Sequence, residues 1–176
     1  IPDNILTIEF GAHFNKIVNV SYNSKIKSIT FKNLYNRSVN SFPRKIKIIV
    51  FGNDFNKSMN NMPNLCERIS LGNNFNKRLN YLPNTLNFFH IDFNFSHNLN
   101  NLPTRVDKII LKSRRIKKIN ILPNFLTHLI IKGCCGTDSL HVKKLLKICE
   151  KSRCYKRVDI GESRITTKYY NQRKFI

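Results

Sequence analysis

Residues 43–62, PRKIKIIVFGNDFNKSMNNM, and residues 63–82, PNLCERISLGNNFNKRLNYL, are two copies of one unit. In both copies, apolar residues stand three, six and eight positions after the proline, as Ile46, Ile49 and Phe51 do in the first. This L-x-x-L-x-L spacing is the strand signature of leucine-rich repeats. The last two positions lie on one side of an extended strand, because side chains alternate along it. Each copy therefore predicts one short strand with a buried face.

The unit extends in both directions along the chain. Prolines recur every 20 residues from Pro43 to Pro123. The interval between Pro2 and Pro43 holds two units, one with a single inserted residue, and Asn23 takes the proline position of the second. A fixed period of this size indicates a solenoid. We call its units coils and number them one to seven from Pro2 to Pro123.

The predicted fold is an α/β solenoid similar to leucine-rich repeats, right-handed, with mostly parallel strands in one curved sheet and irregular return loops. Repeats are expected over residues 1–133 and a capping region over 134–176. In the capping region, Val142, Leu145 and Cys149 follow helical spacing and predict a helix over about 138–152. A strand is expected at 158–161, followed by a charged end over 163–174 that covers the open core.

The return path of each coil repeats as well. Twelve positions after the coil start, an aromatic column predicts a spine behind the strands: Phe14, Tyr35, Phe55, Phe75 and Phe95. Two asparagine columns follow, at thirteen positions (Asn15, Asn36, Asn56, Asn76) and at seventeen (Asn19, Asn40, Asn60, Asn80, Asn100, Asn120). An amide offers donors and an acceptor, so asparagines turned inward can satisfy backbone groups of adjacent coils. We expect two asparagine ladders.

These residues carry a family resemblance. The segments Phe51–Asn56 (FGNDFN) and Leu71–Asn76 (LGNNFN) resemble the F-G-x-x-F-N core of FNIP repeats, and Phe10–Asn15 (FGAHFN) is a third copy. The Leu82-Pro83-Asn84 joint is also similar to that family. The resemblance covers about residues 1–133. The coils depart from it in length, with 20 residues where the family has about 22, and in lacking Gln-Pro after F-N.

The resemblance implies a function and a location. FNIP repeats resemble leucine-rich repeats and occur in proteins of social amoebae and giant viruses. Several carry an upstream F-box, which implies substrate recognition for a ubiquitin ligase, although this chain shows no F-box. The implied location is intracellular and cytoplasmic, within a host cell if the protein is viral. We expect no cofactor.

A partner-binding face is expected on the concave side of the sheet, at the strand positions that point away from the core. Several residues there are apolar although solvent is expected, which is typical of binding surfaces. β-branched residues also suit strands for structural reasons, so both interpretations stay open. The expected partner-binding residues are Ile48, Val50, Arg68, Phe88, His90, Lys108, Ile110, His128 and Ile130.

Charge suggests a second kind of partner. The chain has 31 basic and 10 acidic residues, giving a net charge of +21 and a pI near 10.1. A basic column at the loop edge could follow a phosphate backbone. Abundant Asn, Ile, Lys and Phe also indicate AT-rich codons, which weakens that argument. The candidate polyanion-binding residues are Lys16, Arg37, Lys57, Lys77, Arg114, Arg115, Lys117 and Lys118.

Enzyme, metal and membrane functions find little support. The sequence has no G-x-S-x-G, H-E-x-x-H or phosphate-loop motif, so we expect no catalytic residue. Cys66 occupies a core position, and the other four cysteines lie at Cys134, Cys135, Cys149 and Cys154 without a C-x-x-C, so we expect free thiols and no metal site. No apolar run approaches the roughly 18 residues of a membrane span.

Three functions therefore stay open. The first is a protein-interaction scaffold, with an adaptor role in an F-box-type ligase as its special case. The second is a nucleic-acid or polyanion binder, and the third a structural, virion-associated repeat protein. The sequence leaves the oligomeric state undetermined.

Overall fold

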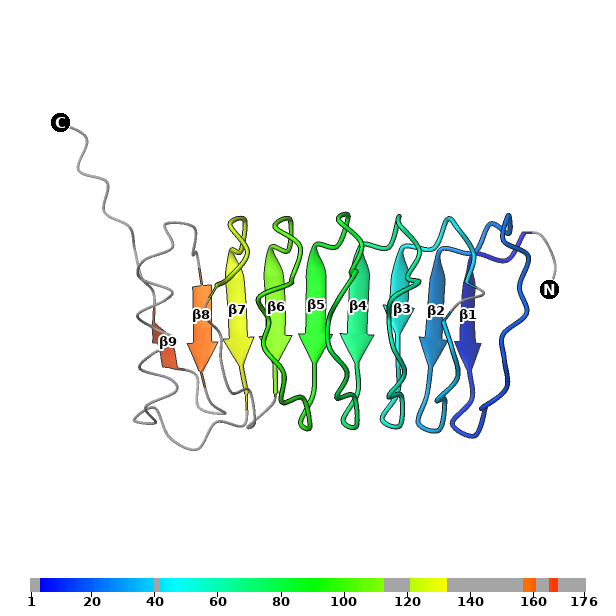
Figure 1. The fold of residues 1–176 in the computed structure, drawn as a ribbon, viewed down its shortest axis with the longest axis horizontal. Coiled ribbons are helices and arrows are strands. Elements are labelled where there is room, and N and C mark those ends of the chain that lie inside the picture. The colour runs from blue at the N-terminus through cyan, green and yellow to red at the C-terminus, as the bar shows by residue number, and fades with distance from the viewer. Residues whose placement is uncertain (1–3, 40–41, 113–120, 133–156, 161–164, 168–176) are drawn as a thin grey trace.

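The computed structural model describes residues 4–39, 42–112, 121–132, 157–160 and 165–167. These residues contain a nine-stranded sheet in which the strands follow one another in chain order (Figure 1). The strands are β1 (Thr7–Phe10), β2 (Ser28–Phe31), β3 (Ile48–Val50), β4 (Arg68–Leu71), β5 (Phe88–Ile91), β6 (Lys108–Leu111), β7 (His128–Ile131), β8 (Arg157–Ile160) and β9 (Ile165–Thr167). Neighbouring strands from β1 to β8 are parallel.

The register of the sheet agrees with the alignment of coils that the proline spacing predicts. Ile29 of β2 pairs with Ile8 of β1 and with Ile49 of β3, so equivalent positions of successive coils lie side by side. Ile29 and Ile49 are fully buried. The return loops cross one face of the sheet in Figure 1, and the core lies between the strands and these loops. The predicted solenoid of parallel strands is confirmed.

The aromatic spine is also confirmed. Successive rings are 6.2, 6.3, 6.0 and 6.2 Å apart between centroids, from Phe14 through Tyr35, Phe55 and Phe75 to Phe95. The last four are completely buried. A second aromatic stack joins the spine in the first three coils, because Phe31 and Phe51 stack on Tyr35 and Phe55 at 3.7 and 3.8 Å. Stacked rings fill the core and fix the spacing between coils.

The first asparagine column forms the predicted ladder. The backbone N–H of Asn36 donates to Oδ1 of Asn15, and the same bond recurs from Asn56 to Asn36, from Asn76 to Asn56 and from Ser96 to Asn76. Each bond is 3.0 Å long. We call this column the amide ladder. In each of coils two to five it pairs a half-buried backbone N–H that would otherwise lose its hydrogen bond on folding.

The second asparagine column is arranged differently. Asn19 and Asn60 are exposed, so the prediction that they turn inward is wrong. The residue before each of them, Val18 or Met59, fills the core, and the following side chain therefore points to solvent. Asn80 does form a bond between coils, but it accepts from Nδ2 of Asn101 in a different column. Asn40 and Asn120 lie outside the described residues.

The C-terminal strand prediction is confirmed by β8, which pairs in parallel with β7. The antiparallel strand β9 was not predicted; it pairs with the far edge of β8. The expected helix over 138–152 and most of the charged end lie outside the described residues. The division at residue 133 stays a prediction.

Glycine marks two coils in which neighbouring backbones approach closely. A side-chain carbon on Gly52 or Gly72 would overlap the backbone of the preceding coil. Coil five has Asp92 in the same column, and there the backbone N–H donates to the carbonyl of Leu71 at 3.2 Å. Directly after β5 there is therefore room for a side chain, and the carboxylate of Asp92 lies beside the sheet.

Candidate functional site

The outer sheet face is the side of the strands that points away from the core and the return loops. Its side chains come from alternate strand positions, as the burial pattern of β4, β5 and β6 shows. The structure brings the predicted residues together across β3 to β7: Ile48 pairs with Arg68, Arg68 with Phe88, and Lys108 with His128. Apart from exposed Arg68, they are half-buried. We expected the apolar residues of this face to be more exposed to solvent than they are. Adjacent outward-facing side chains cover one another and reduce that exposure.

Two cations flank an aromatic ring at the centre of this face. The guanidinium carbon of Arg68 lies 4.6 Å from the centroid of the Phe88 ring, and Nζ of Lys108 lies 5.8 Å from it. These three residues, the cation–ring trio, come from β4, β5 and β6 at one register position. Contacts of this kind contribute about 0.5–1 kcal/mol at exposed sites. They hold both cations close to the sheet surface.

A chain of polar contacts runs beside the trio. Oγ of Ser70 lies 2.6 Å from Nδ1 of His90, and Nε2 of His90 lies 3.0 Å from Oδ1 of Asp92. Nζ of Lys112 lies 3.0 Å from the same carboxylate oxygen. We call Ser70, His90, Asp92 and Lys112 the outer polar chain. The His90 and Asp92 side chains are only 18% and 14% exposed, so their contacts are partly shielded from water.

The environment of Asp92 keeps its carboxyl group ionised. Burial by itself would raise the pKa of Asp92, but the contacts with His90 and Lys112 outweigh that effect and hold the pKa below its ordinary value. The carboxylate of Asp92 is therefore already in contact with two neighbours, of which Lys112 carries a positive charge. The cations of the trio remain available to a partner, since no carboxylate of the described residues pairs with Arg68 or Lys108.

Serine, histidine and aspartate in contact resemble a nucleophile, a base and an orienting group. Catalysis of acyl transfer also requires hydrogen-bond donors aimed at the developing oxyanion. Within β4 and β5, the backbone N–H groups bond to neighbouring strands and are not available for that purpose. We therefore interpret the outer polar chain as a support of a binding surface.

The sequence did not single out Ser70, Asp92 or Lys112. The signal was present, because Ser70 and His90 share one column in adjacent coils and Asp92 lies two residues after His90 on the same side of the strand. The column that contains Asp92 has glycine in coils three and four. The charged residues of this column, Asp92 and Lys112, were therefore harder to recognise. Stacking of adjacent coils, read column by column, would have found the contact.

The basic column lies on the return side. Lys16, Arg37, Lys57 and Lys77 are all exposed, and Nε of Arg37 donates to the carbonyl of Asn15 at 2.9 Å. Arg114, Arg115, Lys117 and Lys118 lie outside the described residues. The structure therefore aligns the described half of the predicted set.

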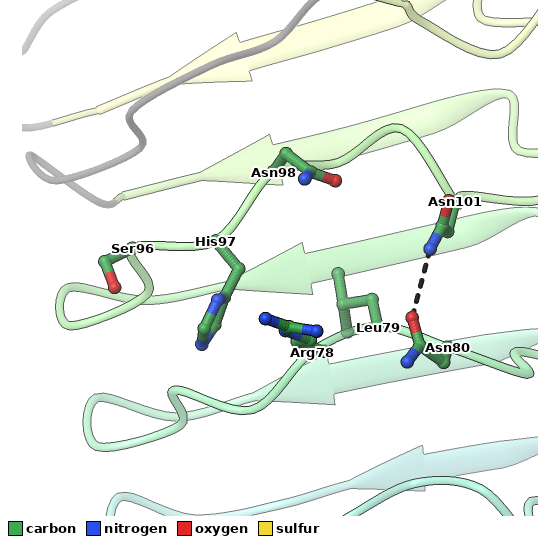
Figure 2. A pocket seen from close by; sticks show the side chains of 7 residues that line it. All are labelled: Arg78, Leu79, Asn80, Ser96, His97, Asn98 and Asn101. Atoms are coloured by element: carbon green, nitrogen blue, oxygen red, sulfur yellow. Dashed lines mark hydrogen bonds between the residues drawn. The ribbon is translucent and has the colours of Figure 1, made fainter.

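A hollow of about 490 Å³ lies near the end of this column, between the return loops of coils four and five (Figure 2). Arg78, Asn80, His97, Asn98 and Asn101 contribute polar groups to it, and Leu79 contributes an apolar surface. Of these residues, the sequence analysis named only Asn80. It assigned Asn80 to a ladder and did not predict a hollow.

Cys66 is a buried free thiol, as expected. Burial raises its pKa to about 12, so the thiol stays protonated and unreactive at neutral pH. The other four cysteines lie outside the described residues. In the part of the chain that the structure describes, no group of His, Cys, Asp and Glu side chains could hold a metal ion, and no helix is long and apolar enough to cross a membrane.

The chain was compared with known proteins. No family model matches it, and no curated protein matches it. It is similar to the solved structure of CroV588, which is described as a novel circular LRR protein from a giant virus. The TM-score is 0.60 at 20% sequence identity, and the similarity covers 92% of this chain and 28% of that one. The chain thus spans less than a third of the neighbour's length. This similarity supports the leucine-rich-repeat-like fold, and the FNIP resemblance stays a prediction.

Proposed function

We propose that this chain is a non-catalytic protein-interaction scaffold, and that its outer sheet face binds an acidic segment of a partner protein. Repeat proteins present extended, rigid surfaces, and the leucine-rich-repeat-like fold is commonly used in this way. A surface built on strands holds its side chains in fixed positions, which lowers the entropy cost of binding. The solenoid thus supplies the scaffold, and the outer side chains supply the specificity.

The cation–ring trio is the observation that carries this proposal. Arg68 and Lys108 lie on either side of Phe88, and the nearby carboxylate of Asp92 is occupied by His90 and Lys112. The face therefore presents unmatched positive charge beside an aromatic ring. Half-buried Ile110 contributes apolar area next to it. A peptide that alternates glutamate with an apolar residue complements both features.

Matched peptides test the proposal directly. One peptide alternates glutamate with phenylalanine and leucine, and its control has glutamine in place of every glutamate. We expect measurable binding of the glutamate peptide alone, by fluorescence anisotropy at low salt. The double variant Arg68→Gln/Lys108→Gln should weaken binding by about tenfold or more, as the loss of two charge-assisted contacts predicts.

A second double variant supplies the control. Lys16→Gln/Lys57→Gln removes the same charge from the return side, and it should leave peptide affinity within about twofold. Equal losses in the two double variants would mean that net charge alone drives binding. Equal binding of the glutamine peptide would also contradict an acidic partner.

A second candidate function is polyanion binding along the basic column. It is favoured by the exposure of Lys16, Arg37, Lys57 and Lys77 in successive coils, at a spacing of about 4.8 Å per strand. Affinity for a single-stranded oligonucleotide should then fall steeply between 50 and 200 mM salt. Weak binding already at 50 mM salt would rule this function out. A virion-associated structural role predicts neither kind of binding.

The resemblance to FNIP repeats adds a special case of the scaffold function. In that case the chain is the substrate-recognition part of an F-box-type ubiquitin ligase. This requires an F-box in the same protein and copurification with the ligase core from the native cell. Absence of both from the full-length protein would leave the scaffold function without the adaptor role.

A further inference from the structure

The hollow between the fourth and fifth return loops is separate from the outer sheet face. The hollow is lined by return-loop residues, and the core lies between these loops and the strands that carry the outer face. Its volume of about 490 Å³ falls within the range of small-molecule sites, about 300–1,000 Å³. Its lining residues come from two adjacent coils, so its shape depends on how their loops diverge.

Coil four has an unusual backbone conformation directly after Asn80, one of the lining residues. Tyr81 has a φ of 62°, and among the described residues other than glycine it is the one with a positive φ. A bulky side chain in this region of the backbone is uncommon and costs free energy. Beside this residue, Nδ2 of Asn101 donates to Oδ1 of Asn80 at 3.0 Å, a bond that spans 21 residues where strands β4 and β5 pair at a spacing of 20. Strain of this kind is concentrated at ligand sites.

The polar groups of the hollow are oriented by bonds to the protein. Nε2 of His97 lies 3.2 Å from the carbonyl oxygen of Asn76, which can only accept, so this nitrogen is the donor and Nδ1 is left for a ligand. Oδ1 of Asn80 accepts from Asn101, which leaves the Asn80 amide N–H groups as donors and Oδ1 of Asn101 as an acceptor. The lining contains a guanidinium and no carboxylate.

The two ends of the hollow differ in chemistry. Figure 2 shows Arg78 and His97 toward one end and the bonded pair Asn80–Asn101 at the other, with Leu79 between them. A guanidinium is suited to bidentate recognition of a phosphate. Amides can both donate to and accept from hydroxyl groups.

We propose that this hollow binds a small sugar phosphate, with the phosphate at Arg78 and the sugar hydroxyls at Asn80 and Asn101. This group occurs both free in solution and within a nucleic acid, and the shared chemistry is a phosphate attached to a pentose. A single monophosphate fits the one guanidinium of the lining. The test below distinguishes the two sources.

Calorimetric titration with four probes tests the assignment: ribose 5-phosphate, ribose, inorganic phosphate and a single-stranded RNA oligonucleotide. We expect ribose 5-phosphate to bind at least about tenfold more tightly than ribose or inorganic phosphate, since only it contacts both ends. Arg78→Gln should weaken its binding by about tenfold or more. Arg105→Gln, which removes the same charge from an exposed residue outside both the hollow and the basic column, should leave it within about twofold.

Two further variants keep the test decisive. Arg78→Lys retains the charge but loses the fork geometry, so it gives a result even if Arg78→Gln disturbs folding. Asn101→Ala should weaken ribose 5-phosphate and leave inorganic phosphate unchanged. No binding of ribose 5-phosphate at millimolar concentration, or equal losses in Arg78→Gln and Arg105→Gln, would overturn the proposal. If the oligonucleotide binds and ribose 5-phosphate does not, the phosphate contacts belong to a nucleic acid and a free sugar phosphate is not the ligand.

Discussion

Two polar columns cross the coils on opposite sides of the sheet, and they differ in how often they recur. The amide ladder repeats one bond of 3.0 Å from coil to coil, with asparagine as the acceptor each time. The outer polar chain occurs once among the described residues and uses four residue types. A contact that every coil repeats serves the stacking of coils. A contact made once gives one stretch of the outer face its own chemistry.

Among the repeated features, the largest loss of stability is expected from a substitution in the aromatic spine, next to the amide ladder. Phe55 is fully buried and stacks on Tyr35, Phe51 and Phe75. Phe55→Ala should lower the free energy of unfolding by about 3–5 kcal/mol, because it leaves a cavity between coils. Urea denaturation followed by circular dichroism measures this loss. A loss below about 1 kcal/mol would mean that the spine does not hold the coils together.

The ladder itself should show the next largest effect. Asn56→Ala leaves the backbone N–H of Asn76 without its acceptor, and we expect a loss of about 1–3 kcal/mol. Asn60→Ala is the matched control four residues later, where the side chain is exposed. It should change stability by no more than about 0.5 kcal/mol. Similar losses in the two variants would remove the distinction between the two asparagine columns.

On the outer face, the effect of replacing Asp92 on the stability of the fold should depend on pH. The contacts of Asp92 lower its pKa in the folded state, so ionised Asp92 stabilises the fold above the ordinary aspartate pKa. This contribution is lost as pH falls through the folded-state pKa. We expect Asp92→Asn to lose about 1 kcal/mol or less at pH 7, and the difference from the wild type to shrink towards pH 3. The amide ladder does not titrate, so the loss in Asn56→Ala should stay constant over that range.

The smallest expected effect concerns one proton. The carboxylate of Asp92 can only accept, and Oγ of Ser70 can donate to the other ring nitrogen, so neutral His90 should carry its proton on Nε2. Nitrogen chemical shifts of the imidazole identify this tautomer. Ser70→Ala should alter the Nδ1 shift of His90 while changing stability by less than about 0.5 kcal/mol. A proton on Nδ1 in neutral His90 would contradict the described chain of contacts.

The repeated features could be predicted from the sequence, because each is written several times. The register of the strands, the aromatic spine and the amide ladder all follow from columns of equivalent residues. The strand at β8 could be predicted from the same pattern. Repetition gives several independent observations of one structural environment, which a single position cannot give.

Features that occur once were harder to predict. The two asparagine columns look alike in sequence, but only packing decides that Asn56 faces the next coil and Asn60 faces solvent. The inserted residue of coil one has a similar consequence. Tyr22 is 61% exposed at the position where coils two to five have buried Phe42, Met62, Leu82 and Leu102, and Val20 packs against the core. The hollow lies beside the unusual backbone of Tyr81, which residue type does not indicate.

The amide ladder also bears on how a protein of this kind can change its length. Each rung joins a side chain of one coil to the backbone of the next, and both partners recur after 20 residues. Deleting or duplicating a complete internal unit would bring equivalent groups back into contact at the new junction. Ancestral genes could therefore grow or shrink by whole modules, extending or shortening the recognition surface by about 4.8 Å per module, without new core residues having to be selected.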